Sequence, residues 1–271
     1  MSVVAAVQMA SGPNVKANLE EAEKLVKTAV QQDAELVVLP ENFAIMGLTE
    51  VDKVAIAESA GDGPIQQFLS QQAKKHGVWI VGGTIPIESS VTGKVYSASL
   101  LFNDSGDMIA RYDKIHLFDV VLEDSNESYN ESETIESGDD VVVVDTPFGK
   151  LGMAVCYDLR FPELFRAMAD VGMELCVLPS AFTNLTGRAH WESLLRARAI
   201  ENLCYMIAPD QGGYHKSGRE TYGDSMIIDP WGVVLNRLPH GTGVVVSDVD
   251  LEKLRKTRVN FPALQHKRLD C

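Results

Sequence analysis

Apolar residues occur along this chain in two arrangements: short continuous runs, typical of buried strands, and sets spaced three or four apart, typical of amphipathic helices. In the first half, these patterns predict strands over residues 2–9, 34–40 and 78–87, helices over 16–32 and 64–77, and a hairpin over 95–118. In the second half, they predict strands over 141–147, 150–158, 173–182, 205–213, 225–232 and 244–250, helices over 162–171 and 190–203, and a helix and tail over 251–271. Strands alternate with helices through most of the chain, which is the pattern of an α/β fold.

Two of the predicted strands have similar sequences, "AELVVLPENF" and "MELCVLPSAF". Each follows a predicted helix and ends at Leu-Pro. This likeness predicts two α-β-β halves related by a pseudo-repeat. The two sheets would pack face to face with helices outside, as a four-layer α-β-β-α sandwich. No linker or shift in composition separates the halves, so we expect one domain over 1–271.

Residues 119–140 differ in composition from the rest of the chain. They contain nine acidic residues, and no lysine or arginine occurs between Lys114 and Lys150. The pattern predicts an acidic loop. Such a segment is either a solvated surface loop or, given its length inside a compact domain, a functional flap.

The charge balance limits the partners that this chain can bind. Its 271 residues have 24 Lys and Arg against 38 Asp and Glu, a formal net charge of −14. That charge repels phosphate backbones and anionic lipids, so we expect neither nucleic acid nor a membrane surface as a partner. An anionic substrate would need a local cluster of basic residues.

The N-terminal segment and the cysteines point to a reducing compartment. The chain begins "MSVVAAVQMASG", which lacks the basic start of a signal peptide, and no apolar run reaches the length of a membrane span. Four cysteines form no C-x-x-C pair, so we expect free thiols in the cytoplasm. The six histidines show no metal-ligand spacing, and neither a metal nor a cofactor is expected.

Cys156 is the first candidate for chemistry. It lies in "KLGMAVCYDLRFPELF", between an apolar strand and a helix that begins at Pro162. A cysteine near the start of a helix has its pKa lowered from about 8.5 toward neutrality, which favours a nucleophile. The alternative is a buried structural cysteine, the interpretation that we keep for Cys176 and Cys204.

A nucleophilic thiol requires a base and a group that holds the oxyanion. His116 and His190 are the candidate histidine bases, although neither has an evident orienting partner in the sequence. The alternative is a carboxylate with an ammonium group. Glu41 follows the apolar run "LVVLP", which would partly desolvate it and make it a stronger base, and Lys114 ends a predicted strand.

Three motifs resemble those of the nitrilase superfamily, the carbon–nitrogen hydrolases, and occur in the same order: "LPENF", "YDKIHLFD" and "AVCYDLRFPEL". The resemblance extends along essentially the whole chain. It implies the α-β-β-α fold, a homodimer or higher homo-oligomer, and a catalytic triad of Glu41, Lys114 and Cys156. A second glutamate of the family corresponds to Glu131 in "YNESET". There the chain departs from the family pattern, because "LEDSN" replaces a Pro-Gly and Tyr129 replaces a phenylalanine.

The resemblance also implies a reaction and a substrate class. Glu41 would act as the base, Lys114 and the backbone N–H of Tyr157 would bind the oxyanion, and an amide would be hydrolysed through a cysteine thioester. "DQGGYHKSGRETYGDSMIIDPWG" looks most like the deaminated-glutathione amidase branch, with an omega-amidase as the alternative. A non-catalytic nitrilase-like binding protein is a further possibility. The residues proposed to bind substrate are Arg160, Thr186, Arg188 and His190, with Lys216 and Arg219 as further cationic candidates for substrate carboxylates.

Overall fold

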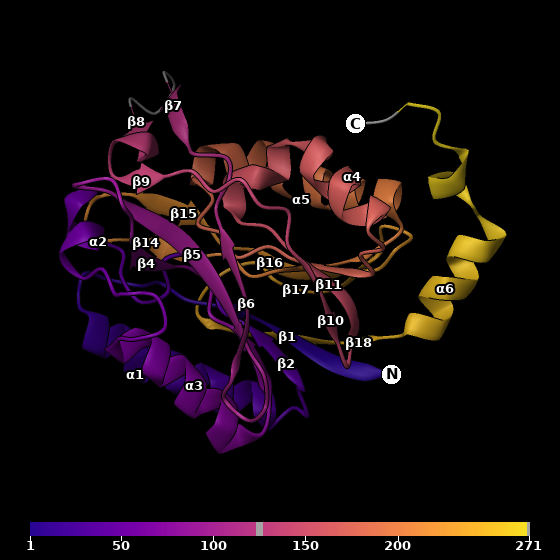
Figure 1. The fold of residues 1–271 in the computed structure, drawn as a ribbon, viewed down its shortest axis with the longest axis horizontal. Helices are drawn as coiled ribbons and strands as arrows, with labels where there is room; N and C mark the ends of the chain where they lie inside the picture. Colours follow the sequence, from indigo (N-terminus) through magenta and orange to yellow (C-terminus); the bar gives the residue numbers. More distant parts are fainter. Residues whose placement is uncertain (123–126, 270–271) are drawn as a thin grey trace.

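The computed structural model of the protein describes residues 1–122 and 127–269, and two β-sheets form its centre (Figure 1). The first sheet has the order β18-β1-β2-β3-β5-β4, with β6 and β9 also paired to β5. Its strands are β1 (Ser2–Gln8), β2 (Leu36–Val38), β3 (Trp79–Val81), β4 (Ile85–Glu88), β5 (Val95–Phe102), β6 (Met108–Asp113), β9 (Ile135–Glu136) and β18 (Gly243–Val249).

The second sheet has the order β10-β11-β12-β13-β16-β17. Its strands are β10 (Val143–Thr146), β11 (Gly149–Met153), β12 (Leu175–Val177), β13 (Tyr205–Ala208), β16 (Ser225–Ile228) and β17 (Val234–Leu238). Two hairpins lie outside both sheets: β7 (Asp119–Leu122) with β8 (Glu127–Asn130), and β14 (Gly212–Tyr214) with β15 (Glu220–Tyr222).

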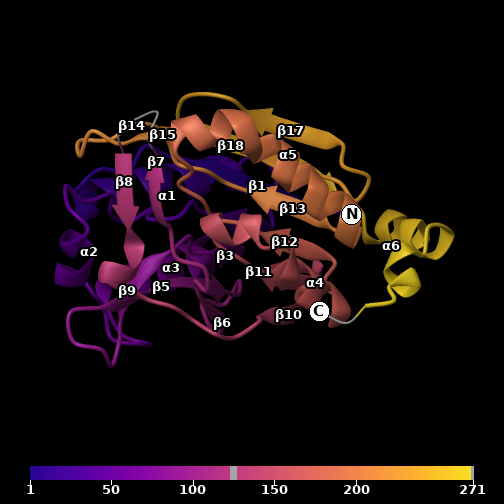
Figure 2. The same ribbon diagram turned by 90° about the horizontal axis from the view of Figure 1, so that it is seen from above.

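Helices cover the outer face of each sheet, which gives the four layers (Figures 1 and 2). Helices α1 (Val15–Val30) and α3 (Pro64–His76) pack on the first sheet, whereas α4 (Pro162–Asp170) and α5 (Asn184–Asn202) cover the second. Asn14 caps α1 by accepting a hydrogen bond from the backbone of Ala17. A short α2 (Val51–Ala55) was not predicted, and α6 (Leu251–Asn260) lies at one end of the molecule, where its Arg258 donates to the carbonyl of Met173 just before β12 (Figure 1).

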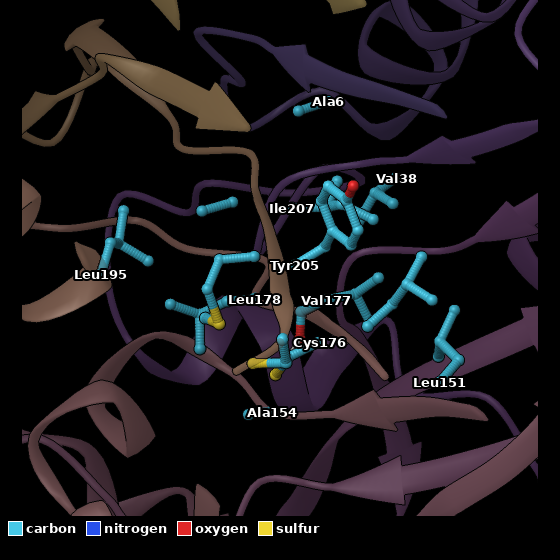
Figure 3. Close-up of a cluster of buried hydrophobic side chains, with 14 of the residues drawn as sticks. Ala6, Val38, Leu151, Ala154, Cys176, Val177, Leu178, Leu195, Tyr205 and Ile207 are labelled. Carbon is cyan, nitrogen blue, oxygen red and sulfur yellow. Dashed lines mark hydrogen bonds between the residues drawn. The ribbon is translucent and has the colours of Figure 1, made fainter. Parts of the chain in front are cut away.

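Alternating residues of β1 show how the layers are joined. Val4 and Ala6 belong to the apolar cluster between the two sheets, and Ala5 and Val7 belong to the cluster under α1 and α3. Both faces of the strand are therefore buried, which explains why its sequence is continuously apolar. Figure 3 shows part of the cluster between the sheets, where Ala6 and Val38 lie near residues of β12 and β13.

The predicted pseudo-repeat is confirmed by strand topology. In the first sheet, β1, β2 and β3 are parallel neighbours and β5 runs antiparallel to them; β11, β12, β13 and β16 repeat this arrangement in the second. Leu39-Pro40 follows β2, and Leu178-Pro179 follows the equivalent β12. The two Leu-Pro segments therefore end corresponding strands at corresponding edges.

The strand predicted over 244–250 is confirmed as β18, and it pairs with β1 of the first sheet. Two predictions require correction. The helix predicted over 190–203 begins at Asn184. The segment 119–140 is not a plain loop, because β7, β8, the 3₁₀ turn η2 (Glu131–Glu133) and β9 lie within it. The part of that prediction at 123–126 and the free thiol expected at Cys271 lie outside the described residues.

Cys156, Cys176 and Cys204 are buried free thiols. A search of the described helices finds none that combines the length and the apolar character needed to cross a membrane.

Candidate active site

The four candidate catalytic residues meet in one pocket, although they come from separate elements. Glu41 follows β2, Lys114 follows β6, Cys156 follows β11, and Glu131 begins η2 after the β7–β8 hairpin. β2 and β11 are parallel-sheet strands, and their carboxyl ends face the same region, where α/β sheets commonly place ligands. The same pocket includes Tyr157 and Thr186 in its wall.

The Lys114 ammonium lies between two carboxylates. Its Nζ is 2.9 Å from Glu41 Oε1, and 2.9 and 2.8 Å from the two carboxylate oxygens of Glu131. Glu131 also accepts a hydrogen bond from the backbone of Phe118 at 2.7 Å. Only 2% of Lys114 and 3% of Glu41 are exposed, so these charges interact with little screening by water.

Cys156 lies on a sharp backbone turn. Its φ is +46°, a left-handed conformation that a non-glycine residue adopts at some energetic cost and that is common at functional sites. Its backbone N–H donates to the carbonyl of Pro179 at 3.0 Å, which links the turn to the Leu-Pro segment after β12. A backbone hydrogen bond from Ala181 reaches the Cys156 thiol.

The structure corrects the expectation of an activated resting thiolate. Helix α4 begins only at Pro162, and a 3₁₀ turn, η3 (Cys156–Arg160), separates it from the cysteine. Burial raises the pKa of Cys156 well above its usual value, and the Glu41 charge raises it further, while Lys114 opposes the shift. Cys156 is therefore a protonated thiol at rest, and its use as a nucleophile requires a base.

The charges around Lys114 fix its own protonation state. Burial alone would lower the pKa of Lys114, but Glu131 and Glu41 outweigh that effect and raise it well above the usual value. Burial works to raise the pKa of Glu131, but Lys114 reverses the shift and holds it below the usual value. Lys114 is thus a fixed cation and Glu131 a fixed anion over the ordinary pH range.

His116 has the orienting partner that the sequence did not reveal. Its Nδ1 lies 2.7 Å from Oδ1 of the fully buried Asp158, and its ring stacks on Phe161 with centroids 3.7 Å apart. His116 nevertheless does not line the pocket with Cys156, and neither does His190. Within the described part of the chain, Glu41 is therefore the better-placed base.

The predicted cationic residues separate into two groups. Arg160 and Arg219 line the pocket, as does Lys53 of α2, a residue that no sequence pattern singled out. Arg188 is exposed and donates to Asn184 at 3.0 Å, and Lys216 is exposed on the loop between β14 and β15. His190 is exposed, and its Nδ1 lies 3.2 Å from Arg160. The structure therefore does not bring Arg188, His190 or Lys216 into the pocket.

A family model for carbon–nitrogen hydrolases matches residues 3–259. The chain is 43% identical over 268 residues to the deaminated glutathione amidase of Synechocystis sp., a match that covers 98% of this chain and 97% of the relative. It is 38% identical over 273 residues to the deaminated glutathione amidase of Homo sapiens, with 100% of this chain and 83% of the relative covered.

Solved structures agree with these matches. Saccharomyces cerevisiae Nit3, a member of branch 10 of the nitrilase superfamily, has a TM-score of 0.89 and 33% identity, covering 99% of this chain and 97% of Nit3. The Caenorhabditis elegans NitFhit protein has a TM-score of 0.92 and 35% identity over 98% of this chain. This chain spans 65% of the length of NitFhit.

The four-layer fold and these relatives define a hydrolase of the nitrilase superfamily. The chain belongs to the carbon–nitrogen hydrolase family, and it is an amidase-type hydrolase that acts on C–N bonds other than peptide bonds.

Proposed function

We propose that this chain hydrolyses a small carboxylated amide through a thioester on Cys156, with Glu41 as base, Lys114 as oxyanion partner and Glu131 as the carboxylate that holds Lys114. The observation that supports this proposal most directly is the buried Glu41–Lys114–Glu131 arrangement in the same pocket as the Cys156 thiol. It supplies in one place the nucleophile, base and cation that acyl transfer requires.

The reaction would proceed as follows. Glu41 accepts the thiol proton as Sγ attacks the amide carbon, and the carbonyl electrons move to an oxyanion bound by Lys114 and the backbone N–H of Tyr157. The tetrahedral intermediate collapses, the C–N bond breaks, and the leaving nitrogen takes the proton from Glu41. The thioester is then attacked by water, which gives its proton to Glu41. When the C–S bond breaks, that proton returns to sulfur and the carboxylic acid leaves.

The pocket also contains guanidinium groups suited to a substrate carboxylate. No ion pair of Arg160 or Arg219 is found among the described residues, and burial lowers the pKa of Arg160. The buried Nε of Arg219 lacks a hydrogen-bond partner there. A partly buried guanidinium without a carboxylate partner is well matched to an anionic ligand. In a chain with a net charge of −14, this cluster favours a carboxylated amide.

The shape of the site favours an extended substrate. The cavity at Cys156 has a volume of about 30 Å³, room for only about two water-sized groups. A second chamber of about 350 Å³ shares Asn42, Glu50, Lys53, Tyr129, Asn130 and Arg219 with it. The reacting amide would occupy the inner cavity and the rest of the substrate the outer chamber. Deaminated glutathione, which has an extended body and carboxylates, is therefore the substrate that we propose.

The test is a comparison of kcat/KM for deaminated glutathione, 2-oxoglutaramate, N-carbamoyl amino acids and simple nitriles. We expect the highest value with deaminated glutathione. A preference for 2-oxoglutaramate would instead identify an omega-amidase with the same triad. No hydrolysis and no covalent adduct at Cys156 with any of these compounds would contradict the proposed reaction and favour a non-catalytic binding protein.

Arg219→Gln is expected to reduce kcat/KM for a carboxylated amide by about 10-fold or more, mainly through KM, because one charge-assisted hydrogen bond contributes about 1.5–3 kcal/mol. An uncharged amide of similar length should be hydrolysed at nearly the wild-type rate. The matched control is Arg188→Gln, which alters a guanidinium outside the pocket. Equal losses for charged and uncharged amides would contradict a carboxylate-binding role.

We also propose that the chain forms a homodimer. Trp231 is 61% exposed and Phe261 is 51% exposed, and their rings contact each other with centroids 5.6 Å apart. Val259, in the last turn of α6, adds exposed apolar surface two residues before Phe261. Light scattering coupled to size exclusion should give the mass of two chains, and Trp231→Glu should shift it toward one. A wild-type protein with the mass of one chain would contradict the dimer.

A further inference from the structure

A buried carboxylate that the proposed reaction does not use lies directly beneath the site. Asp158 of η3 is completely inaccessible to solvent, and it does not line the pocket. A carboxylate buried at this depth is stable only if its oxygens are well hydrogen-bonded. The two oxygens of Asp158 bind two separate segments of the chain, one next to Cys156 and one next to Lys114.

One oxygen of Asp158 binds two partners. Oδ2 accepts from the backbone N–H of Val155 at 2.8 Å and from the hydroxyl of Tyr112 at 2.7 Å. Val155 immediately precedes Cys156. Tyr112 is fully buried, and burial together with the Asp158 charge raises the pKa of its hydroxyl, which stays protonated and remains a donor.

The other oxygen binds the segment just after Lys114. Oδ1 accepts from the backbone N–H of His116 at 3.1 Å and lies 2.7 Å from His116 Nδ1. The imidazole is also held by its stack on Phe161, whose ring plane is only 6° from its own. Tyr112 and His116 thus fix the backbone on both sides of Lys114.

These contacts connect two different sheets. Lys114 follows β6, which pairs with β5 in the first sheet, whereas Cys156 follows β11 in the second. Strands in separate sheets have no backbone ladder between them that could set the distance from the ammonium to the thiol. The carboxylate of Asp158 spans this gap with hydrogen bonds to both segments.

We propose that Asp158 is a positioning residue, which holds the Cys156 turn against the Lys114 segment through Tyr112 and His116. The effect on turnover rests on the proposed function, whereas the effect on the thiol does not. Correct separation of nucleophile and oxyanion partner matters because a displacement of about 1 Å can reduce turnover about 100-fold.

Asp158→Asn is the first test. An asparagine of nearly the same shape has one acceptor oxygen in place of two. Whichever way its amide NH₂ is turned, it faces a backbone N–H, of Val155 or of His116, so one of these two backbone hydrogen bonds must be lost. We expect kcat to fall about 100-fold while KM changes little.

The second measurement is the pH dependence of Cys156 alkylation by iodoacetamide, which needs no amide substrate. The thiol faces Glu41, Asp210 and three cations, Lys114, Arg160 and Arg219. Of these cations, Lys114 is the one that the Asp158 contacts would hold near the thiol, where it favours thiolate. Movement of Lys114 away from the thiol should shift the alkylation profile to higher pH, by about one unit. Tyr112→Phe, which removes one of the contacts without adding a donor, should give a smaller shift in the same direction.

The matched control is Asp229→Asn. Asp229 is also a buried aspartate that accepts two backbone hydrogen bonds, from Trp231 at 2.9 Å and Val233 at 3.0 Å, in the turn after β16. The Asp229→Asn substitution should lower Tm and leave the pH profile of Cys156 alkylation at the wild-type position.

A folded Asp158→Asn variant with the wild-type profile and kcat would overturn the proposal, and so would equal shifts in the Asp158 and Asp229 variants. If Asp158→Asn does not fold, the alkylation profile of Tyr112→Phe becomes the test, and a wild-type profile in that variant would overturn the proposal. If the wild-type protein is alkylated at Cys156 but hydrolyses no amide, the proposed function fails, and the alkylation comparison still tests the positioning role.

Discussion

Replacing Cys156 with alanine is expected to abolish amide hydrolysis, with a fall in kcat on the order of 10⁶ if the thiol is the nucleophile. Alanine leaves Glu41, Lys114 and Glu131 in place, so substrate binding should be retained. The measurement is kcat under saturating deaminated glutathione, together with the intact mass of the acid-quenched enzyme. The wild-type protein should carry an acyl group with the mass of the substrate minus the amine that leaves when the C–N bond breaks, and the variant should carry none.

The control for this prediction is Cys204→Ala. Cys204 is also buried, and burial raises the pKa of its thiol to about 12, but it lies between α5 and β13 and does not line the pocket. That variant should keep the wild-type kcat and the acyl adduct. Hydrolysis by Cys156→Ala at a near-normal rate would contradict the entire mechanism.

The layered fold was predictable because strands buried on both faces and amphipathic helices leave clear periodic signals. The two Leu-Pro strands carried enough likeness to reveal the pseudo-repeat. The pairing of β18 with β1 was not predictable, because Val249 and Ser2 become neighbours only through the tertiary fold, and no local sequence signal specifies such distant pairing.

The start of α5 was mispredicted for a local reason. Its first turn contains Gly187, and glycine weakens a helix signal. The structure explains the glycine, because a Cβ there would lie 2.3 Å from the ring of Tyr222 on β15. Thr183, which caps the helix by accepting from the backbone of Thr186, was the signal that could have revealed the earlier start.

Sequence motifs made the candidate catalytic residues predictable, whereas the contacts that depend on tertiary packing were not predictable. Glu41, Lys114 and Cys156 lie in recognisable motifs, and the structure places them in one pocket. The contacts of Asp158 depend on how two sheets approach, and the wall position of Lys53 depends on a helix too short to predict. The expected low thiol pKa was wrong because burial and the neighbouring Glu41 outweigh any helix start nearby.

Lys114→Met is expected to lower the free energy of unfolding by about 3–5 kcal/mol at pH 7.5, because it removes the cation between two buried carboxylates. In the wild-type protein, the pKa of Glu131 is lowered, so its stabilising contribution is complete above the pKa of the unfolded carboxyl. That contribution is lost as pH falls through the lower folded value. The pKa of Lys114 is raised, so its contribution is complete below the unfolded value and is lost only in strongly basic solution.

In Lys114→Met, protonation of these carboxylates should increase stability, whereas in the wild-type protein it removes a stabilising contribution. Without Lys114, the two carboxylates face each other, the folded pKa of the pair rises, and protonation relieves the repulsion. The stability deficit relative to wild type should therefore shrink between pH 7.5 and pH 5, measured as the free energy of unfolding in urea. Lys75→Met is the control, because Lys75 pairs at 2.6 Å with Glu23 on the surface and its loss should be several-fold smaller at either pH. A deficit in Lys114→Met that stays constant over this range would mean that its cause is lost packing rather than unpaired charge.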